Sequence, residues 1–532
     1  MSTGFKSLAM CALAAGLMAC GGPTSDKDHS PEKEIVMDVK AAASWTERSM
    51  PEIAGALETG EISSEALVQA YLDRIESLDT SGPELNSIIA INPEALDAAR
   101  NIDKRRARGD TIGPLQGMPI LIKDNIETSD RMPTTAGSLA LTENFATSDA
   151  PLIARIKAAD GIILGKTNLS EWANFRSSNS QSGWSGVGGR TKNPHVLDRQ
   201  TCGSSAGSGA ATAASLAAGS VGTETNGSII CPSQANGIVG FKPSLGLVSQ
   251  EGIVPIAFSQ DTAGPMTRTV EGAALLLTVM STDGSGKDYR AGLSPGSLNG
   301  VRVGVMRFSL NNDPMLTARF EEALGVLESQ GAVLVDITVF TPNTSDYWGK
   351  ALRVLQTEFK ATLNDYLAST PESVTTRNLT DLIAFNNENA ETELSVFDQS
   401  LFVTSDTMPG LDDPAYLAAL QDVKQASGDN GIDRLMAEYD VDVLVGPAGP
   451  VMPVIVVGGP DNWPQWAGAG HLAAIAGYPN LTVPMGDVGG VPVGLSFIAA
   501  YGHDADVLTY GYAYEQASGG RKTPEYKPST LD

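Results

Sequence analysis

Short apolar runs separated by helical stretches limit most strongly what this chain can fold into. Residues 118–122 (Met-Pro-Ile-Leu-Ile), 161–165 (Gly-Ile-Ile-Leu-Gly) and 441–445 form such runs. Each is too short for a helix and is rich in branched apolar residues, so we predict a buried strand at each. The stretch Ala150 to Ala159, just before the second run, has helical character. Strands that alternate with helices predict an α/β fold.

Two further stretches are predicted to be helical. The first begins near Ser63 or Ser64, either of which can cap it, and its apolar residues have helical spacing: Leu67, Tyr71, Ile75 and Leu78. The second, residues 205–221, consists mainly of Ala, Gly and Ser. Its small side chains and hydroxyls favour a tightly packed core helix over a membrane span.

The acidic composition excludes one large class of partner. The chain of 532 residues has a formal charge of -26, and nucleic-acid binding requires clustered Lys and Arg. We therefore expect no nucleic-acid partner and a neutral or cationic substrate. The length suffices for two to four ordinary domains and does not decide among them.

The N-terminus has the pattern of an export signal. Residues 1–19 carry one charge, Lys6, ahead of the apolar run Leu8 to Ala19, as in a signal peptide. Leu17-Met18-Ala19-Cys20 resembles a bacterial lipobox, in which Cys20 is acylated and becomes the new N-terminus. The alternative is an ordinary cleaved signal followed by a chance cysteine. Either way the protein is predicted to leave the cytoplasm.

The mature chain is predicted to begin with a flexible tether, residues 20–44, which is polar and lacks a hydrophobic period. Removal of residues 1–19 takes away Lys6 and no acid, so the mature charge is -26 - 1 = -27. We expect a lipid-anchored protein of the periplasm or outer membrane that contacts the membrane through its anchor only.

Two cysteines, Cys202 and Cys231, remain once Cys11 is removed with the signal and Cys20 is acylated. In an oxidising compartment they can pair. The alternative is that both are small buried residues with no thiol chemistry. The sequence leaves the disulfide open.

One short motif suggests an esterase. Gly203-Ser204-Ser205-Ala206-Gly207 matches G-x-S-x-G, the turn that exposes a nucleophilic serine in α/β-hydrolases. Ser205 would then need a histidine base, and His471 or His503 follows it in the required order. Of the other two histidines, His29 lies in the tether. A five-residue pattern is weakly specific.

Three longer blocks compete with that interpretation and are jointly far more specific. They are Ile122-Lys123-Asp124-Asn125, the stretch from Cys202 to Gly209, and the stretch from Gly222 to Ile229. In this order they resemble the amidase signature family, whose catalytic unit is a Ser-cisSer-Lys triad. Carried over by motif, the resemblance implies Ser228 as nucleophile, Ser204 as the cis-serine and Lys123 as base.

The resemblance extends from about Trp45 to Tyr526. It includes Gly165-Lys166-Thr167-Asn168, Ser259-Gln260-Asp261-Thr262 and the stretch Ala476 to Pro484. It implies one large α/β domain with a central mixed β-sheet covered by helices, in place of several domains. We therefore predict a catalytic domain at 45–526 and a C-terminal tail at 527–532. The family resemblance implies no metal and no cofactor.

The implied chemistry is physically reasonable. A serine hydroxyl becomes a good nucleophile when a neighbouring base takes its proton, and a neutral lysine can do so. Lys123 follows an apolar run, and burial there is expected to lower its pKa. Ser204 would relay the proton between Lys123 and Ser228. Backbone N–H groups of the loop would form the oxyanion hole, from these residues: Thr225, Asn226, Gly227 and Ser228.

One loop residue departs from the commonest family pattern, which has glycine where this chain has Asn226. Asparagine tolerates a positive φ better than other residues with a side chain, so the turn can be retained. The bacterial peptide amidase branch, which the chain resembles most, usually carries Asp at this position. That branch removes the C-terminal amide of peptides and releases ammonia.

Other substrates and other classes stay open. Aryl-amide, carbamate and oligoamide hydrolases belong to the same family, as does the subunit that supplies ammonia to a glutamyl-tRNA amidotransferase. Predicted export disfavours the last, because its tRNA partner is cytoplasmic. A lipid-anchored binding protein on an inactive amidase scaffold is a further alternative, against which the presence of all three catalytic residues argues. The sequence does not determine the oligomeric state.

Overall fold

The computed structural model describes residues 42–282 and 284–530, which belong to one compact unit. The predicted signal peptide, Cys20 and His29 lie outside the described residues. A single α/β domain is therefore confirmed for the part of the chain expected to be catalytic.

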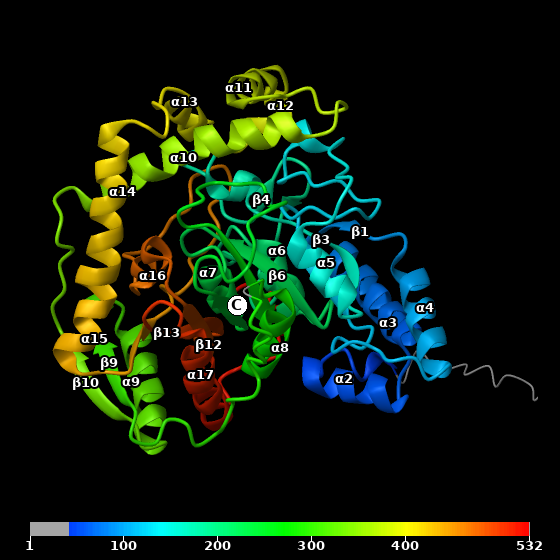
Figure 1. Ribbon diagram of the computed structural model, residues 1–532, viewed down its shortest axis with the longest axis horizontal. Coiled ribbons are helices and arrows are strands. Elements are labelled where there is room, and N and C mark those ends of the chain that lie inside the picture. The colour runs from blue at the N-terminus through cyan, green and yellow to red at the C-terminus, as the bar shows by residue number, and fades with distance from the viewer. Residues whose placement is uncertain (1–41, 283, 531–532) are drawn as a thin grey trace, which may run out of the picture. The chain divides into compact units, whose positions relative to one another are not determined.

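A mixed sheet of eleven strands forms the centre of this unit (Figure 1). The strand order is β1-β3-β2-β6-β8-β7-β12-β13-β11-β9-β10. Strands β3, β2 and β6 are parallel neighbours, as are β11, β9 and β10, and the strands between these two groups are antiparallel. The strands are β1 (Ile88–Ile91), β2 (Pro119–Lys123), β3 (Ile162–Thr167), β6 (Gly219–Glu224), β7 (Val239–Lys242), β8 (Thr262–Thr267), β9 (Arg302–Met306), β10 (Val333–Ile337), β11 (Val443–Pro447), β12 (Asn480–Val488) and β13 (Val491–Ile498). A separate two-stranded ribbon contains β4 (Trp184–Ser185) and β5 (Gly189–Arg190).

Helices surround the sheet. They are α2 (Met50–Thr59), α3 (Ser64–Ile75), α4 (Ala95–Ala107), α5 (Pro151–Ala158), α6 (Ala206–Ala213), α7 (Ile230–Ala235), α8 (Val270–Met280), α9 (Pro314–Ser329), α10 (Tyr347–Ser369), α11 (Leu379–Glu388), α12 (Ala390–Glu393), α13 (Ser400–Asp406), α14 (Pro414–Ser427), α15 (Arg434–Tyr439), α16 (Gly470–Ala476) and α17 (Asp504–Ser518). Short 3-10 or π turns occupy Glu76–Thr80, Leu139–Leu141, Glu171–Asn174, Arg307–Ser309 and Gly428–Asp433.

The predicted strands and the two helices nearest to them are confirmed. The three apolar runs lie in β2, β3 and β11, and every residue of these strands is buried. The helix expected from Ala150 is α5, and the helix expected at Ser64 is α3, with Ser63 as its cap. Ser63 accepts a hydrogen bond from the N–H of Ala66, which satisfies one of the free donors at the start of the helix.

The prediction of one helix over residues 205–221 is wrong. Helix α6 ends at Ala213, and the chain then forms strand β6 from Gly219. Strand β6 pairs with β2 on one side and β8 on the other, so its backbone groups are satisfied by the sheet. Small side chains allow both elements to pack closely, and composition alone did not separate them.

The folded unit begins slightly earlier than expected. Ala42, placed in the predicted tether, is buried against Ala66 and Ala70 of α3. At the other end, the predicted tail contacts the domain, because Arg199 donates a hydrogen bond of 2.6 Å to the hydroxyl of Thr530. Residues on both sides of 45–526 therefore contact the catalytic domain.

A layer of long helices covers one edge of the domain. In Figure 1, α10 runs across the top and α14 descends along the left side. The two helices are joined by a hydrogen bond of 2.9 Å from the Tyr416 hydroxyl to the Glu358 carboxylate. Both lie within residues 285–431, a region whose sequence carries few motifs that indicate a chemical function.

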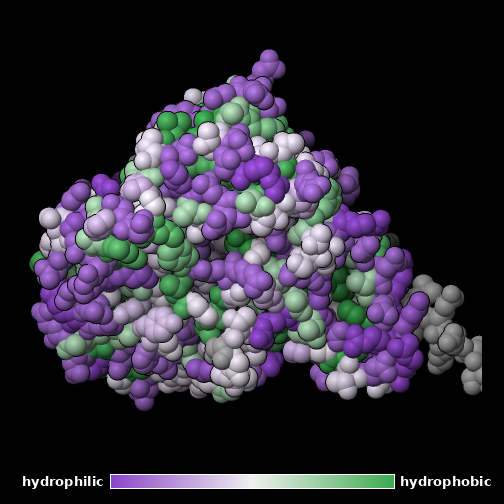
Figure 2. All heavy atoms as spheres, turned by 45° about the horizontal axis from the view of Figure 1, so that its top comes forward, coloured by the Kyte–Doolittle hydropathy of each residue, from purple (hydrophilic) through white to green (hydrophobic). Residues whose placement is uncertain are grey.

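One face of the domain is mainly hydrophilic (Figure 2). Figure 2 shows that hydrophilic residues cover most of the face drawn, with hydrophobic residues in scattered groups. Over the described residues, no helix combines the length and apolarity needed to cross a bilayer.

Candidate active site

Lys123 is the last residue of β2, and its side chain is fully buried. Its Nζ lies 2.7 Å from the Oγ of Ser204 and 2.8 Å from the Oγ1 of Thr223. Burial lowers the pKa of Lys123 to about 7, while the carboxylates of Asp261 and Glu224 act in the opposite direction. A substantial fraction of this lysine is therefore neutral near neutral pH and able to accept a proton.

Ser204 follows a cis peptide bond, Gly203–Ser204, as the family resemblance implies. Its side chain is fully buried, and its carbonyl accepts a hydrogen bond of 3.0 Å from the N–H of Ser170. The next residue, Ser205, donates its N–H to the carbonyl of Ser228 at 3.2 Å. The segments that carry Ser204 and Ser228 are therefore in direct backbone contact.

Ser228 lies in the loop between β6 and α7. The Glu224 carboxylate fixes this loop by accepting the N–H groups of Ile229 and Ile230, at 2.8 and 3.0 Å. The positive φ in the loop falls on Gly227, at 87°, and not on Asn226. The turn therefore depends on a glycine that the chain retains, and the conformational tolerance of Asn226 is not used.

A disulfide joins Cys202 and Cys231, with 5.8 Å between their Cα atoms. The two half-cystines flank the two serines in the sequence. The alternative of two independent small buried residues is therefore wrong, although both residues are buried.

A cavity of about 710 Å³ opens over Ser228. All four residues proposed for the oxyanion hole line it: Thr225, Asn226, Gly227 and Ser228. Lys123 and Ser204 are not part of its wall, and both are fully buried. The serine expected to attack substrate is thus accessible, and the expected base is shielded from water.

Aromatic residues form much of the remaining wall of the cavity. They include Phe308, Phe340, Tyr347, Trp348, Trp463 and Trp466. The rings of Trp463 and Trp466 meet edge to face, with centroids 5.8 Å apart. Sequence reasoning missed all six, since isolated aromatics in loops and at a helix start carry no motif. Among the wall residues in the described chain, Glu224 is the one with an ionisable carboxylate, and none is Lys or Arg.

The residues of the esterase alternative are not brought together. The hydroxyl of Ser205 donates a hydrogen bond of 3.0 Å to the carbonyl of Thr223 and accepts one from the N–H of Thr223. Ser205 is not part of the cavity wall. His471 lines the cavity, and burial lowers its pKa to about 4. His503 is exposed and pairs with Asp506. Within residues 42–282 and 284–530, neither histidine is hydrogen-bonded to Ser205.

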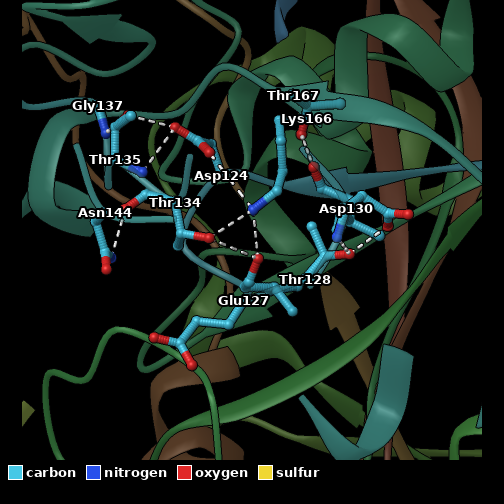
Figure 3. Close-up of polar contacts among 12 residues, drawn as sticks. Asp124, Glu127, Thr128, Asp130, Thr134, Thr135, Gly137, Asn144, Lys166 and Thr167 are labelled. Carbon is cyan, nitrogen blue, oxygen red and sulfur yellow. Dashed lines mark hydrogen bonds and ion pairs between the residues drawn. The ribbon is translucent and has the colours of Figure 1, made fainter. Parts of the chain in front are cut away.

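A second buried lysine supports the segment that follows Lys123 (Figure 3). Lys166 of β3 donates to the carbonyl of Ile126 at 2.5 Å and to the hydroxyl of Thr134 at 2.8 Å, and its Nζ lies 3.6 Å from Asp124. Asp124 also accepts hydrogen bonds from the N–H and hydroxyl of Thr135. Burial raises the pKa of Asp124 to about 6 and lowers that of Lys166. This lysine therefore has a carboxylate partner, whereas Lys123 contacts hydroxyl and carbonyl oxygens.

A known protein family matches most of the chain. The family described as Amidase matches residues 66–508. The chain belongs to the amidase signature family. Amidases of this family are hydrolases that act on amide C–N bonds, and the eleven-stranded sheet agrees with their fold.

Solved amidases are similar over nearly the whole chain. The native peptide amidase from Stenotrophomonas maltophilia is 41% identical, with a TM-score of 0.86, over 91% of this chain and 99% of its own. A structure of the peptide amidase PAM in complex with the competitive inhibitor chymostatin is 42% identical, with a TM-score of 0.87, over 91% and 100% of the two chains. One component of the glutamyl-tRNA(Gln) amidotransferase from Halorhodospira halophila is 35% identical over 493 residues, covering 90% of this amidase and 98% of that relative.

Proposed function

We propose that this amidase hydrolyses the C-terminal amides of peptides through an acyl-enzyme on Ser228, with Lys123 as the base and Ser204 as the proton relay. The observation that carries the proposal is the contact of 2.7 Å between Lys123 Nζ and Ser204 Oγ, at a lysine that is fully buried. Ser228 lines the adjacent cavity, where a substrate carbonyl can reach it.

The proposed steps combine these positions with the Ser-cisSer-Lys triad that the family resemblance implies. Neutral Lys123 takes the proton of Ser204 while Ser204 takes the proton of Ser228, and the Ser228 oxygen bonds to the amide carbon. The developing oxyanion accepts hydrogen bonds from the backbone N–H groups of the Thr225–Ser228 loop. The proton returns through Ser204 to the leaving nitrogen, the C–N bond breaks and ammonia departs. Water then attacks the ester, and the carboxylic acid is released with Ser228 restored.

The cavity supports a peptide amide as substrate. Its volume of about 710 Å³ exceeds what a small amide needs, and its aromatic wall suits a bulky apolar acyl group. The absence of Lys and Arg from the wall residues of the described chain disfavours an anionic substrate. The similarity to peptide amidases supports the same assignment.

One other function has a specific observation in its favour. The 35% identity to a component of a glutamyl-tRNA(Gln) amidotransferase extends over 98% of that relative. A role of that kind requires a tRNA-bound partner, and the charge of -26 together with the proposed export argues against it. Aryl-amide and carbamate substrates are compatible with the same site, so their turnover is best compared directly with that of amidated peptides.

We also propose that the enzyme is an exported lipoprotein acylated at Cys20, because Leu17-Met18-Ala19-Cys20 ends an apolar leader. A Cys20→Ser variant should move the activity from the membrane fraction to the soluble fraction, with specific activity unchanged. Continued membrane association of this variant would contradict the proposal.

A substrate panel and one variant test the enzymatic proposal. Amidated peptides, simple amides, aryl amides and carbamates are supplied to the wild type, with ammonia or amine measured as product. Ser228→Ala should fold normally, fail to react with a fluorophosphonate probe and lose turnover by at least about 10⁴-fold. Normal probe labelling of Ser228→Ala would disprove the nucleophile. Faster turnover of aryl amides or carbamates than of peptide amides would disprove the substrate class.

A further inference from the structure

Two adjacent residues, Gln260 and Asp261, hold the loop that carries Ser228. Both bind Thr225, the first residue of this loop. Gln260 donates a hydrogen bond of 3.0 Å from its Nε2 to the carbonyl of Thr225. The Thr225 hydroxyl donates a hydrogen bond of 2.6 Å to Oδ1 of Asp261. Thr225 lines the cavity three residues before Ser228. Both its main chain and its side chain are therefore fixed from one side.

Asp261 is itself held rigidly. Its second oxygen, Oδ2, accepts the N–H groups of Ile256 and Ala257 at 2.7 and 2.9 Å. Asp261 accepts three hydrogen bonds in all through its carboxylate. A group fixed in this way can hold Thr225 in one position with little loss of entropy on substrate binding.

The same segment is attached to the helical layer. The N–H of Ser259 donates to the Glu358 carboxylate of α10 at 2.9 Å, and Lys424 of α14 donates to the carbonyl of Ser259 at 2.7 Å. Tyr347 and Trp348, at the start of α10, line the cavity. The helix that contributes to the cavity wall therefore also anchors the residues that hold Thr225.

We propose that Gln260 and Asp261 are positioning residues for the oxyanion loop, acting through Thr225. They touch neither substrate nor nucleophile, and they fix the loop whose N–H groups receive the developing negative charge. This inference rests on the proposed acyl-enzyme mechanism. Loss of the Thr225 contacts should lower kcat and change KM little. The reason is that the loop N–H groups bind the oxyanion of the transition state more strongly than the carbonyl of the bound substrate.

Asp261 also affects the base through its charge. The charges of Asp261 and Glu224 both raise the pKa of Lys123, against the larger effect of burial. Glu358 in turn acts on Asp261, whose pKa burial raises to about 6. Removal of the Asp261 charge should therefore let Lys123 lose its proton at lower pH. If Asp261 had only a structural role, its replacement would leave the pH of this inflection unchanged.

Two variants separate position from charge. Thr225→Val keeps the shape and the Asp261 charge and loses the hydroxyl, so we expect kcat to fall on the order of 10- to 100-fold with the pH inflection unchanged. Asp261→Asn removes the charge, and its amide can still accept from Ile256 and Ala257 and donate to the Thr225 hydroxyl. For this variant we expect the inflection of kcat/KM to move to lower pH by about 1 unit.

Matched controls show that the substitutions themselves are tolerated. Thr380→Val removes an exposed threonine–carboxylate bond, to Asp406. Asp504→Asn alters a buried carboxylate that accepts the N–H and hydroxyl of Ser244, outside the site. Both should leave kcat and the pH inflection at wild-type values. Thr225→Ser, which keeps the hydroxyl, should recover most of the rate lost in Thr225→Val.

The outcomes distinguish this inference from the proposed function. If the wild type turns over amides and Ser228→Ala does not, the proposed mechanism holds. A folded Thr225→Val variant with kcat within about threefold of wild type would then overturn the positioning role alone. An unmoved inflection in folded Asp261→Asn would do the same for its charge. Gln260→Met, which removes only the bond to the Thr225 carbonyl, carries the kcat test if the other variants do not fold.

Discussion

Cys202 and Cys231 are covalently joined, so the segment of Ser204 and the segment of Ser228 are crosslinked at the wall of the cavity. Each cysteine lies two or three residues from one of these serines. The crosslink closes a loop with a sequence separation of 29. Such a bond restricts the unfolded chain and also limits relative movement of the two segments.

Reduction of this disulfide should weaken both stability and activity. Loss of a crosslink of this loop length is expected to lower the free energy of unfolding by about 2–4 kcal/mol. Thermal unfolding and amide turnover are measured with and without reductant, and mass spectrometry confirms that the thiols are free. The Cys202→Ala, Cys231→Ala double variant should match the reduced wild type and ignore reductant. Full activity of the reduced, folded enzyme would contradict this expectation.

Amide hydrolysis should increase with pH through an inflection near 7. The pKa of Lys123 is lowered by burial to about 7, and only its neutral form can accept a proton. The rate is therefore low below the pKa, where the ammonium prevails, and levels off above it. A profile of kcat/KM from pH 5 to 9 measures this directly. A profile that is flat across neutral pH would exclude Lys123 as the titrating base.

Variants of Lys123 separate a base from a simple positive charge. Lys123→Ala should lose most of the rate, since neither serine can then be deprotonated near neutral pH. Lys123→Arg should be almost as slow, because a guanidinium stays protonated. Near-normal amide turnover by Lys123→Arg would refute the relay.

The His471→Ala variant should retain Ser228-dependent labelling by the fluorophosphonate probe.

Lys166 should matter for stability. It is fully buried beside Asp124 and donates to Ile126 and Thr134. Lys166→Met leaves a buried carboxylate without its cation, which typically costs about 3–5 kcal/mol. Replacement of both partners, Lys166→Met with Asp124→Leu, should recover part of that loss. Denaturant unfolding of the two single variants and the double variant gives the coupling energy, and simple additivity would mean that the pair does not interact.

The aromatic wall should determine which acyl groups bind. Trp466 lines the cavity and is 45% exposed, so a substrate ring can cover it. Trp466→Ala should raise KM for a peptide amide that ends in Phe or Tyr about 5- to 10-fold. A small amide such as acetamide serves as control and should show unchanged kinetics. An equal effect on both substrates would mean that Trp466 supports the fold and not recognition.

The parts of the site that sequence could predict are those built from short local segments. Lys123 follows an apolar run that forms a fully buried strand, so its burial was predictable from its neighbours alone. The blocks around Ser204 and Ser228 were recognisable because their order and residues resemble those of the amidase signature family. The disulfide was left open, because pairing depends on a distance that spacing does not give.

The parts that sequence missed depend on contacts between distant segments. Thr223 of β6 contacts Lys123 of the neighbouring parallel strand β2. Asp261, just before strand β8, accepts a hydrogen bond from Thr225. The helix α6 was predicted too long, since Ala, Gly and Ser pack equally well in a helix and in a crowded strand. The aromatic wall escaped notice because its residues are spread over more than 150 positions and meet only in the folded chain.

The lysine and serines of the proposed triad come from residues 123–228, whereas most aromatic residues of the cavity wall, all except Phe175, come from residues 308–348 and 463–466. The cleavage machinery and most of the aromatic surface that contacts the amide are therefore encoded by different stretches of the gene. Substitutions or insertions in the second set can change the preferred substrate without disturbing a buried base whose protonation depends on its close surroundings. Diversification of such an enzyme should therefore proceed fastest in the wall segments, with the loop around Gly227 staying constant.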